Sequence, residues 1–184
     1  MAAMRLNTRA ELWALRGDPP APLRLRDLWC EVRTIKTTAD VPPASGLRSA
    51  VPYTIACRDE VDARPGQYLA VGARLWILDS RRDLPAERGR LLTATELLGE
   101  PAMLTPAGGP PVTPLRAALL RSAAALGEFG GGVERRAHVE VCAFEIPALA
   151  AGDRIAVAGA DWIVIEPVPE SWDGVTYQAW VQPA

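Results

Sequence analysis

Short runs of alternating apolar and polar residues, separated by glycine-rich and proline-rich turns, recur along this chain. Two of these runs are alike: residues 66–78 read Gly-Gln-Tyr-Leu-Ala-Val-Gly-Ala-Arg-Leu-Trp-Ile-Leu, and residues 152–164 read Gly-Asp-Arg-Ile-Ala-Val-Ala-Gly-Ala-Asp-Trp-Ile-Val. Glycine tolerates positive φ at turns, while Val, Ile, Leu and Trp fit a half-buried pleated surface. Each run therefore predicts a β-hairpin that turns at Gly72 or Gly159.

Five residues are expected to be structural in these units. Gly66 and Gly152 begin the two hairpins, and Trp76 and Trp162 occupy matching positions in the return strands. Trp29 lies in an earlier strand that alternates apolar and charged residues. Because large aromatic side chains contribute most of their binding and folding energy when buried, we expect all three tryptophans in the core.

The similarity continues outside the hairpins and predicts a tandem duplication. Tyr53–Cys57 matches His138–Cys142, and the Pro-Leu-Arg segment ending at Arg24 matches the one ending at Arg116. Two copies are too few for a solenoid, so each half must close its own core. We expect two domains, residues 1–98 and residues 99–184, with the first copy carrying a longer insertion.

The remaining pattern predicts strands and loops with little helix. The expected strands are 11–15, 23–35, 53–58, 91–97, 101–105, 115–124, 137–146, 155–158, 162–165 and 175–181, with a phase slip near Leu28 that indicates a bulge or a short helix. Proline and glycine make residues 36–51 an extended loop, residues 81–90 a polar tip and residues 126–136 a mobile loop. The fold class is all-β: two tandem small antiparallel β-barrels with long loops.

Charge and composition narrow the class of protein. The 184 residues are 49% hydrophobic with a net charge of −2, but residues 1–98 hold 15 basic and 12 acidic side chains and the remainder hold 5 and 10. This asymmetry has three interpretations: it orients copies head to tail, it faces one half towards nucleic acid, or the charges are simply scattered and solvated. An apolar run of about 18 residues and a signal-peptide pattern are both missing, so we expect a soluble protein made in the cytoplasm, without a membrane partner.

Catalytic and metal-binding patterns are absent from the sequence. His138 precedes Cys142 by four residues on one strand, too far along it for proton transfer between the two side chains. Three scattered cysteines with one histidine do not supply a zinc site, and the acidic residues at 59–62 lack calcium-loop spacing. The cysteines fit reduced, buried thiols better than a disulfide framework. We expect no enzyme activity, cofactor or metal.

A basic surface is the one remaining indication of a ligand. The cationic side chains of the first half include Arg24, Arg26, Arg33, Lys36 and Arg48, but few aromatic residues accompany them and the pI is about 5.5. Sequence-specific reading of DNA is therefore disfavoured, while passive proximity to DNA is compatible with the pattern.

Three segments together resemble a known family. Asp27-Leu-Trp-Cys-Glu-Val32, Tyr53-Thr-Ile-Ala-Cys-Arg58 and the residue 66–77 hairpin resemble the head-closure (stopper) proteins of long-tailed bacteriophages, and the second copy, around residues 152–164, is similar to the relatives that join heads to tails. The members usually consist of one such unit, so the duplication departs from the family. The family has no catalytic residues to carry over.

The resemblance implies a small barrel with long loops, assembled as a ring in the virion neck. Implied partners are other copies of the chain (a hexamer, or alternatively a dodecamer), a portal or adaptor protein, a tail terminator or tail tube protein, and packaged DNA by proximity only. Lys36 and Arg48, in the 36–51 loop, are then candidates for facing the DNA in the lumen or contacting a neighbouring subunit. Two other classes remain open at this point: a two-barrel adhesion or peptide-binding module, and a hydrolase with an unrecognised site.

Overall fold

The computed structural model describes residues 6–35, 46–85, 88–126, 133–169 and 171–184. In these ranges the secondary structure is almost entirely β, with strands β1 (Thr8–Arg16), β2 (Ala21–Thr34), β3 (Arg48–Arg58), β4 (Tyr68–Val71), β5 (Arg74–Leu84), β6 (Gly89–Leu97), β7 (Glu100–Thr105), β8 (Val112–Leu126), β9 (Val133–Cys142), β10 (Arg154–Val157), β11 (Ala160–Pro167) and β12 (Thr176–Pro183). Among the described residues, no helix is long and apolar enough to cross a membrane.

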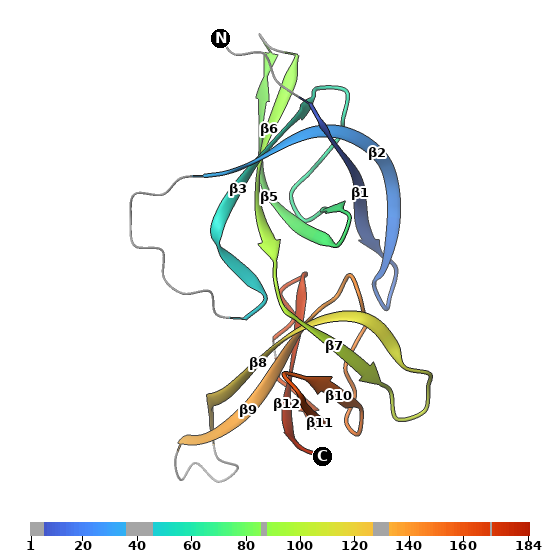
Figure 1. The fold of residues 1–184 in the computed structure, drawn as a ribbon, viewed down its shortest axis with the longest axis vertical. Helices are drawn as coiled ribbons and strands as arrows, with labels where there is room; N and C mark the ends of the chain where they lie inside the picture. The colour runs from blue at the N-terminus through green and yellow to red at the C-terminus, as the bar shows by residue number, and fades with distance from the viewer. Residues whose placement is uncertain (1–5, 36–45, 86–87, 127–132, 170) are drawn as a thin grey trace. The chain divides into compact units, whose positions relative to one another are not determined.

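The strands close into two six-stranded antiparallel barrels (Figure 1). The first has the order β1-β2-β3-β6-β5-β4 and the second β7-β8-β9-β12-β11-β10, which is the same order in each barrel. The chain accordingly divides into two compact units, residues 1–18 with 22–98 and residues 19–21 with 99–184. The all-β, two-barrel fold predicted from the sequence is confirmed.

The two predicted hairpins, β4–β5 and β10–β11, hold matching places in the two barrels. In the first, Leu69 pairs with Trp76 on one side and with Leu12 of β1 on the other. In the second, Ile155 pairs with Trp162 and with Leu104 of β7. In each barrel the first strand of the hairpin, β4 or β10, therefore lies between the first and fifth strands, and the aromatic residue of the return strand enters the core.

Glycine begins both hairpins for the same reason. The amide of Gly66 donates to the carbonyl of Leu78 at 2.8 Å, and the amide of Gly152 donates to the carbonyl of Val164 at 2.9 Å. Their φ angles are +81° and +88°, a left-handed conformation that a side chain at Cβ disfavours. The glycines set the point at which each return strand closes on its partner.

Each barrel has its own hydrophobic core. Trp76 is 1% exposed and packs with Leu12, Leu69, Leu78 and Ile55 in the first, while Trp162 is 9% exposed and packs with its counterparts in the second. The expectation that Trp29 is a core residue is wrong, since it is 58% exposed. Leu28 and Cys30 face the interior of β2, so alternation sends Trp29 outward.

The register corrects two of the sequence correspondences. Leu78 and Val164 are equivalent, because each lies two residues after the tryptophan of its hairpin. Leu78 pairs with Ala94, which pairs with Tyr53. Val164 pairs with Val181, which pairs with Ala137. Tyr53 is therefore equivalent to Ala137 and Cys57 to Val141, one residue away from the match that the sequence alone indicates. In the same way Cys30 pairs with Cys57 as Ala117 pairs with Val141. Arg116 is then equivalent to Trp29 and not to Arg24.

This one-residue correction matters because side-chain direction alternates along a strand. Cys57 and Val141 both lie in their barrel cores, whereas Cys142 lies on the opposite face of β9 from Val141 and outside the core cluster. The two Cys residues therefore match in sequence without matching in structure.

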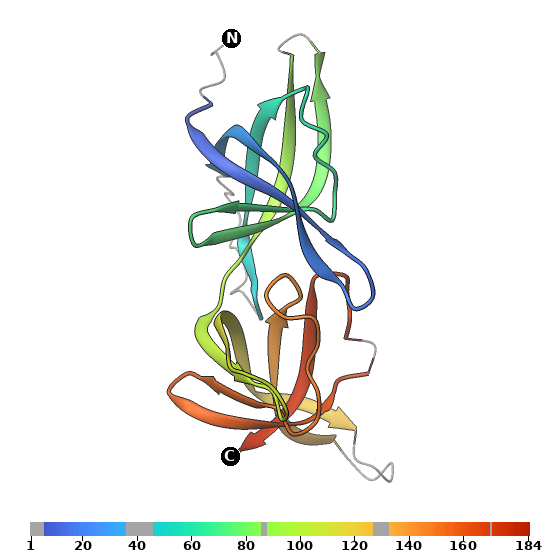
Figure 2. The ribbon, with the colours of Figure 1, turned by 90° about the vertical axis from the view of Figure 1, so that its right-hand side faces the viewer.

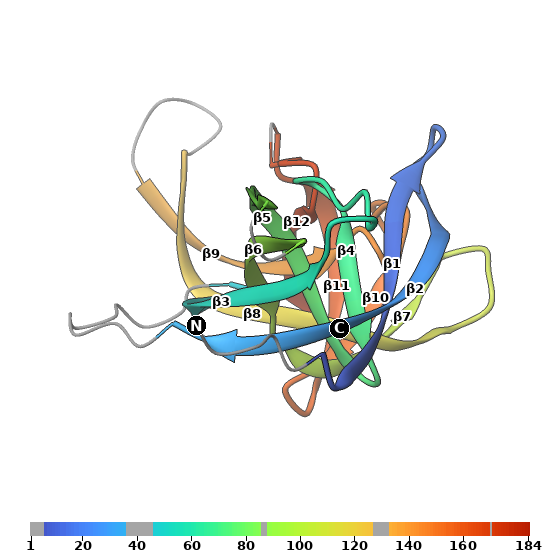
Figure 3. The same cartoon turned by 90° about the horizontal axis from the view of Figure 1, so that it is seen from above.

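Several predicted loops are shorter than expected. Strand β3 already begins at Arg48, and Leu47 is fully buried, so the end of the expected 36–51 loop belongs to the barrel; residues 36–45 lie outside the described residues. β5 and β6 continue through most of the expected polar tip and run side by side (Figure 2). β8 and β9 likewise extend through Leu126 and from Val133, forming a hairpin that reaches beyond the β9–β12 pairing (Figure 3).

Candidate functional site at one end of the first barrel

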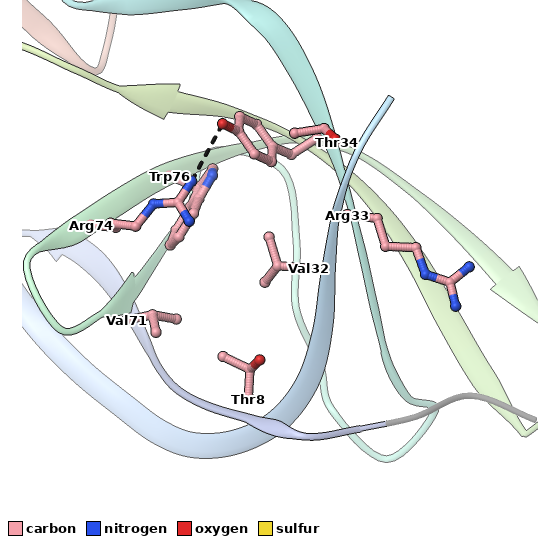
Figure 4. Close-up of a pocket in the computed structure, with 8 residues that line it drawn as sticks. Thr8, Val32, Arg33, Thr34, Val71, Arg74 and Trp76 are labelled. Atoms are coloured by element: carbon pink, nitrogen blue, oxygen red, sulfur yellow. Dashed lines mark hydrogen bonds between the residues drawn. The ribbon is translucent and has the colours of Figure 1, made fainter. Parts of the chain in front are cut away.

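A cavity of about 470 Å³ opens at the end of the first barrel where β2 finishes and β4 turns into β5. Its lining combines apolar, aromatic, hydroxyl and cationic side chains: Thr8, Val32, Arg33, Thr34, Tyr53, Val71, Arg74 and Trp76. In Figure 4, Val32 stands between Trp76 and the pair Val71 and Thr8, while the side chain of Arg33 points away from them. We call this cavity the mouth pocket.

Arg74 is the most constrained charged residue of the mouth pocket. Its Nε and Nη2 donate to the two carboxylate oxygens of Glu96 at 2.6 and 2.9 Å, and Nη2 also lies 3.3 Å from the hydroxyl of Tyr53. The guanidinium carbon lies 4.5 Å from the centre of the Trp76 ring and 5.6 Å from that of Tyr53. The bidentate pair raises the pKa of Arg74 and fixes the plane of its guanidinium.

The register explains why these four residues meet. Glu96 lies directly opposite Trp76 across β5 and β6, and Tyr53 lies on β3, the next strand. The Tyr53 and Trp76 rings meet edge to face with centres 5.9 Å apart. Burial, followed by the hydrogen bond to Glu96, raises the pKa of the Tyr53 hydroxyl. The hydroxyl therefore stays protonated at neutral pH.

Two hydrogen-bond donors at the mouth pocket have no acceptor among the described residues. The buried indole Nε1 of Trp76 has no hydrogen-bond partner among the described residues. Over the same residues, no hydrogen bond is formed by Nη1 of Arg74, because Glu96 and Tyr53 occupy only Nε and Nη2. The buried indole Nε1 is out of reach of a ligand, so of these two donors only the exposed guanidinium of Arg74 could donate to one.

The second barrel lacks this arrangement at its equivalent positions. Ala160 stands where Arg74 does, Pro183 faces Trp162 as Glu96 faces Trp76, and Ala137 replaces Tyr53. A smaller hollow there, of about 270 Å³, is lined by the β10–β11 turn and Pro101. Among the described residues, this cluster of charged and aromatic side chains is not repeated at the equivalent end of the second barrel.

Three of the basic residues singled out in the sequence have acidic or backbone partners. Arg24 pairs with Glu11 and Asp27, and Arg33 pairs with Glu31 at 2.7 Å. Arg26 donates to the backbone carbonyls of Asp27 and Glu60. The carboxylates partly offset the positive charge of Arg24 and Arg33.

The structure describes one of the two loop residues that were expected to face DNA or a neighbouring subunit. Arg48 lies in β3 and pairs with Leu97 of β6, so it is part of the barrel wall. Lys36 lies outside the described residues.

The thiols and the histidine do not form a reactive centre in the part of the chain that is described. Cys30, Cys57 and Cys142 are free and buried, and burial raises the pKa of Cys30 and of Cys142 to about 12. His138 packs edge to face against Trp180, and desolvation lowers its pKa. No group of three or more metal-binding side chains occurs within the described ranges.

Sequence reading missed the ion pairs and loop anchors that hold the barrels. Arg116 pairs with Glu145 at 2.7 Å, and the buried carboxylate of Asp153 accepts from the amides of Ala107 at 3.0 Å and Ala150 at 2.9 Å. In the sequence, only the match of Gly152-Asp153 to Gly66-Gln67 indicated that Asp153 anchors a loop. Gln67 plays the corresponding part in the first barrel, where its side chain accepts from the amide of Arg64 at 2.8 Å. These residues position loops and do not form a pocket.

Comparison with known proteins gives one match. A family model described as Phage Head-Tail Attachment protein matches residues 84–181. The matched residues include β6 and extend over the second barrel into β12. No curated protein and no solved structure matches the chain.

Proposed function

This chain belongs to the phage head-tail attachment protein family, and we propose that in the virion neck it closes the DNA-filled head and joins it to the tail. Membership makes it a structural virion component that interacts with other head and tail components. Closure of the head and a place in the neck are the further steps of the proposal.

The family match over the second barrel carries this proposal. It covers more than half of the chain and includes nearly the whole of one closed barrel. The first barrel has the same strand order and resembles the head-closure proteins in its own sequence segments. Two barrels of this kind in one chain support a role in connecting two different neighbours, one on the head side and one on the tail side.

We propose that the protein acts as a ring. Copies that meet through unlike surfaces close into a ring when the rotation between them permits, and the charge difference between the residues of the two halves supplies unlike surfaces. A hexamer is the favoured ring and a dodecamer the alternative. The proposed neighbours are a portal or adaptor protein and a tail terminator or tail tube protein, with packaged DNA near the ring only by proximity.

Common ancestry of the two barrels is a further part of the proposal. It is supported by the equal strand order and by the matching placement of Trp76 and Trp162. The replacement of Arg74 and Glu96 by Ala160 and Pro183 then records divergence of one end of the second barrel.

Particles made without the protein test the proposal. In a phage lysate lacking this gene product, we expect heads that have lost DNA and tails that remain free, seen by electron microscopy, with infectivity restored when the protein is supplied. Tailed, DNA-filled, infectious particles from the same lysate would contradict it. If the protein were instead a peptide-binding or adhesion module with no place in the neck, mass spectrometry would not detect it in purified connectors.

A further inference from the structure

We propose that Cys30 and Cys57 form a redox pair in the first barrel, which a small-molecule disulfide such as oxidised glutathione converts into an intramolecular disulfide. The bond would join β2 to β3 at the end of their ladder. This inference goes beyond the proposed function and does not depend on it.

The β2–β3 register places the two thiols directly opposite one another. Cys30 pairs with Cys57, and the same register continues to Ile35, whose amide donates to the carbonyl of Pro52 at 2.9 Å. Hydrogen-bonded and non-hydrogen-bonded pairs alternate along an antiparallel ladder. Since Ile35 and Pro52 are a hydrogen-bonded pair five steps along, Cys30 and Cys57 are a non-hydrogen-bonded pair. Such pairs bring side chains closest, with Cα atoms about 4.5 Å apart, which lies in the usual disulfide range of roughly 4.4–6.8 Å.

Both thiols also lie on the same face of the barrel wall. Cys30 and Cys57 are free, buried members of the core cluster of the first barrel. The second barrel has Ala117 and Val141 at the equivalent positions, so a core of this fold does not require two thiols there. The third cysteine, Cys142, is paired with Thr176 of β12 and therefore serves as an internal control.

The cysteine pair is the last rung of the β2–β3 ladder. Pairing runs from Thr34 with Tyr53 to Cys30 with Cys57. Beyond Thr34 the chain itself connects the two strands, whereas beyond Cys30 they part, β2 pairing onwards only with β1. A terminal rung opens more readily than an inner one, which gives a small oxidant slow access to thiols that are buried in the closed barrel. A disulfide here ties the end that the chain leaves untied, and it persists only in oxidising surroundings.

The surroundings of the two thiols set the order of the exchange. Burial raises the pKa of Cys30 to about 12. Burial raises the pKa of Cys57 as well, but the positive charges of three arginines offset part of that rise: Arg90, Arg81 and Arg26. Because the thiolate is the attacking form, Cys57 is the first nucleophile and Cys30 the second.

The exchange consumes one oxidant molecule for each bridge. The Cys57 thiolate attacks one sulfur of oxidised glutathione, which breaks its S–S bond and releases one glutathione thiolate. The Cys30 thiolate then attacks the Cys57 sulfur of the mixed disulfide, forming the Cys30–Cys57 bond and releasing the second glutathione thiolate. The protons of the two cysteines pass through solvent to the released thiolates. The protein loses two electrons and the oxidant gains them.

Oxidation of the folded, full-length protein tests the pair. The protein is kept for about a day in oxidised glutathione at pH 8, its remaining thiols are alkylated, and its peptides are identified by mass spectrometry. We expect a Cys30–Cys57 disulfide in more than half of the chains, reversed by dithiothreitol, with Cys142 still reduced. The bridged protein should unfold about 5–10 °C higher, because the bond restrains the unfolded chain between the two cysteines.

Variants that copy the second barrel provide matched controls. Cys30→Ala should stop at a mixed disulfide between Cys57 and glutathione, with no rise in the unfolding temperature. Cys57→Val should form the mixed disulfide on Cys30 at least tenfold more slowly, because the pKa of that thiol is raised to about 12. Cys142→Ala should form the bridge and gain stability as the wild type does.

Four results would overturn the inference. They are two thiols that stay reduced in the folded protein, a bridge that forms only after unfolding and refolding in the oxidant, equal bridging of Cys142, and a bridged protein that unfolds no higher than the reduced one. Each is measured on purified protein without phage. Failure here would leave the proposed neck function standing, whereas absence of the protein from the neck would remove that function and leave the redox pair.

Discussion

Arg74 and Glu96 form a bidentate ion pair on neighbouring strands of the first barrel, with very unequal burial of the two side chains. The Arg74 side chain is 53% exposed and that of Glu96 only 7%. An exposed guanidinium that loses its partner is rehydrated, whereas a buried carboxylate that loses its partner remains in a poorly solvated site. The pair therefore matters mainly as the compensation for Glu96.

This asymmetry predicts unequal costs for the two single substitutions. Arg74→Ala should destabilise the protein by about 3 kcal/mol, and Glu96→Gln by about 1 kcal/mol, in urea unfolding at pH 7. In Arg74→Ala the uncompensated carboxylate should have a raised pKa, so lowering the pH towards 5 should restore part of the lost stability. Equal losses with no effect of pH would show that Glu96 is not held by Arg74.

Three of the six tryptophans predict a graded set of stability losses. Trp76→Ala and Trp162→Ala should each cost about 3–5 kcal/mol, because each removes a large buried side chain from a barrel core. Trp29→Ala, at an exposed position on β2, should cost less than about 0.5 kcal/mol and serves as the matched control. Chemical denaturation followed by circular dichroism measures all three. A large loss for Trp29→Ala would show that its side chain contributes to folding.

The buried thiols predict slow reaction with a thiol reagent. Cys30, Cys57 and Cys142 are each 0% exposed, and the pKa of Cys30 and Cys142 is raised to about 12. Ellman's reagent at pH 8 should label no cysteine in the native protein within minutes and all 3 after unfolding in guanidinium.

The same raised pKa values give a pH dependence with a definite sign. Stability from the neutral buried thiols is fully present below the unfolded thiol pKa of about 8.5, and it is lost as the pH rises from there towards 12. Cys30→Ala should reduce this alkaline loss. An alkaline unfolding curve identical to that of the wild type would contradict the assignment.

The sequence predicted the fold well because the barrels repeat one alternating pattern. The hairpins that begin at Gly66 and Gly152 could be read from glycine position and apolar alternation alone. The expectation of a buried Trp29 was wrong because apolar side chains lie on both sides of the phase slip near Leu28. In β2 the side chains of Leu28 and Cys30 are buried, and Trp29 between them is exposed. A one-residue shift in matching Cys57 with Cys142 reversed the face assigned to every side chain of β9.

The mouth pocket could not be read from the sequence for a different reason. Arg74, Glu96 and Tyr53 are far apart in the chain and come together only through the β3–β6–β5 register. Neither Arg74 nor Glu96 stands in a motif, and each is a common surface residue type. Only the pairing of Glu96 with Trp76 shows that its carboxylate is buried beside an aromatic ring.

The connection between β2 and β3 yields a prediction about function. Because Leu47 is buried and β3 begins at Arg48, a deletion that spares the barrel must stop at residue 45. Deleting residues 38–45 should leave the thermal unfolding of the protein within a few degrees of wild type, yet yield particles that leak DNA or lack tails. A normal particle titre from this deletion would show that the segment, with Lys36 beside it, is dispensable for closing the head.

The two barrels in each chain predict the number of chains per neck. A hexamer of this protein contains as many barrels as a dodecamer of single-barrel chains. We therefore expect six copies per particle. Such a ring presents twelve similar barrels to one neighbour. The differences between the two barrels, such as Arg74 against Ala160, keep its symmetry six-fold towards the other neighbour. Quantitative mass spectrometry of purified virions, or a reconstruction of the neck, counts the chains. Twelve copies would refute the hexamer and favour the dodecamer.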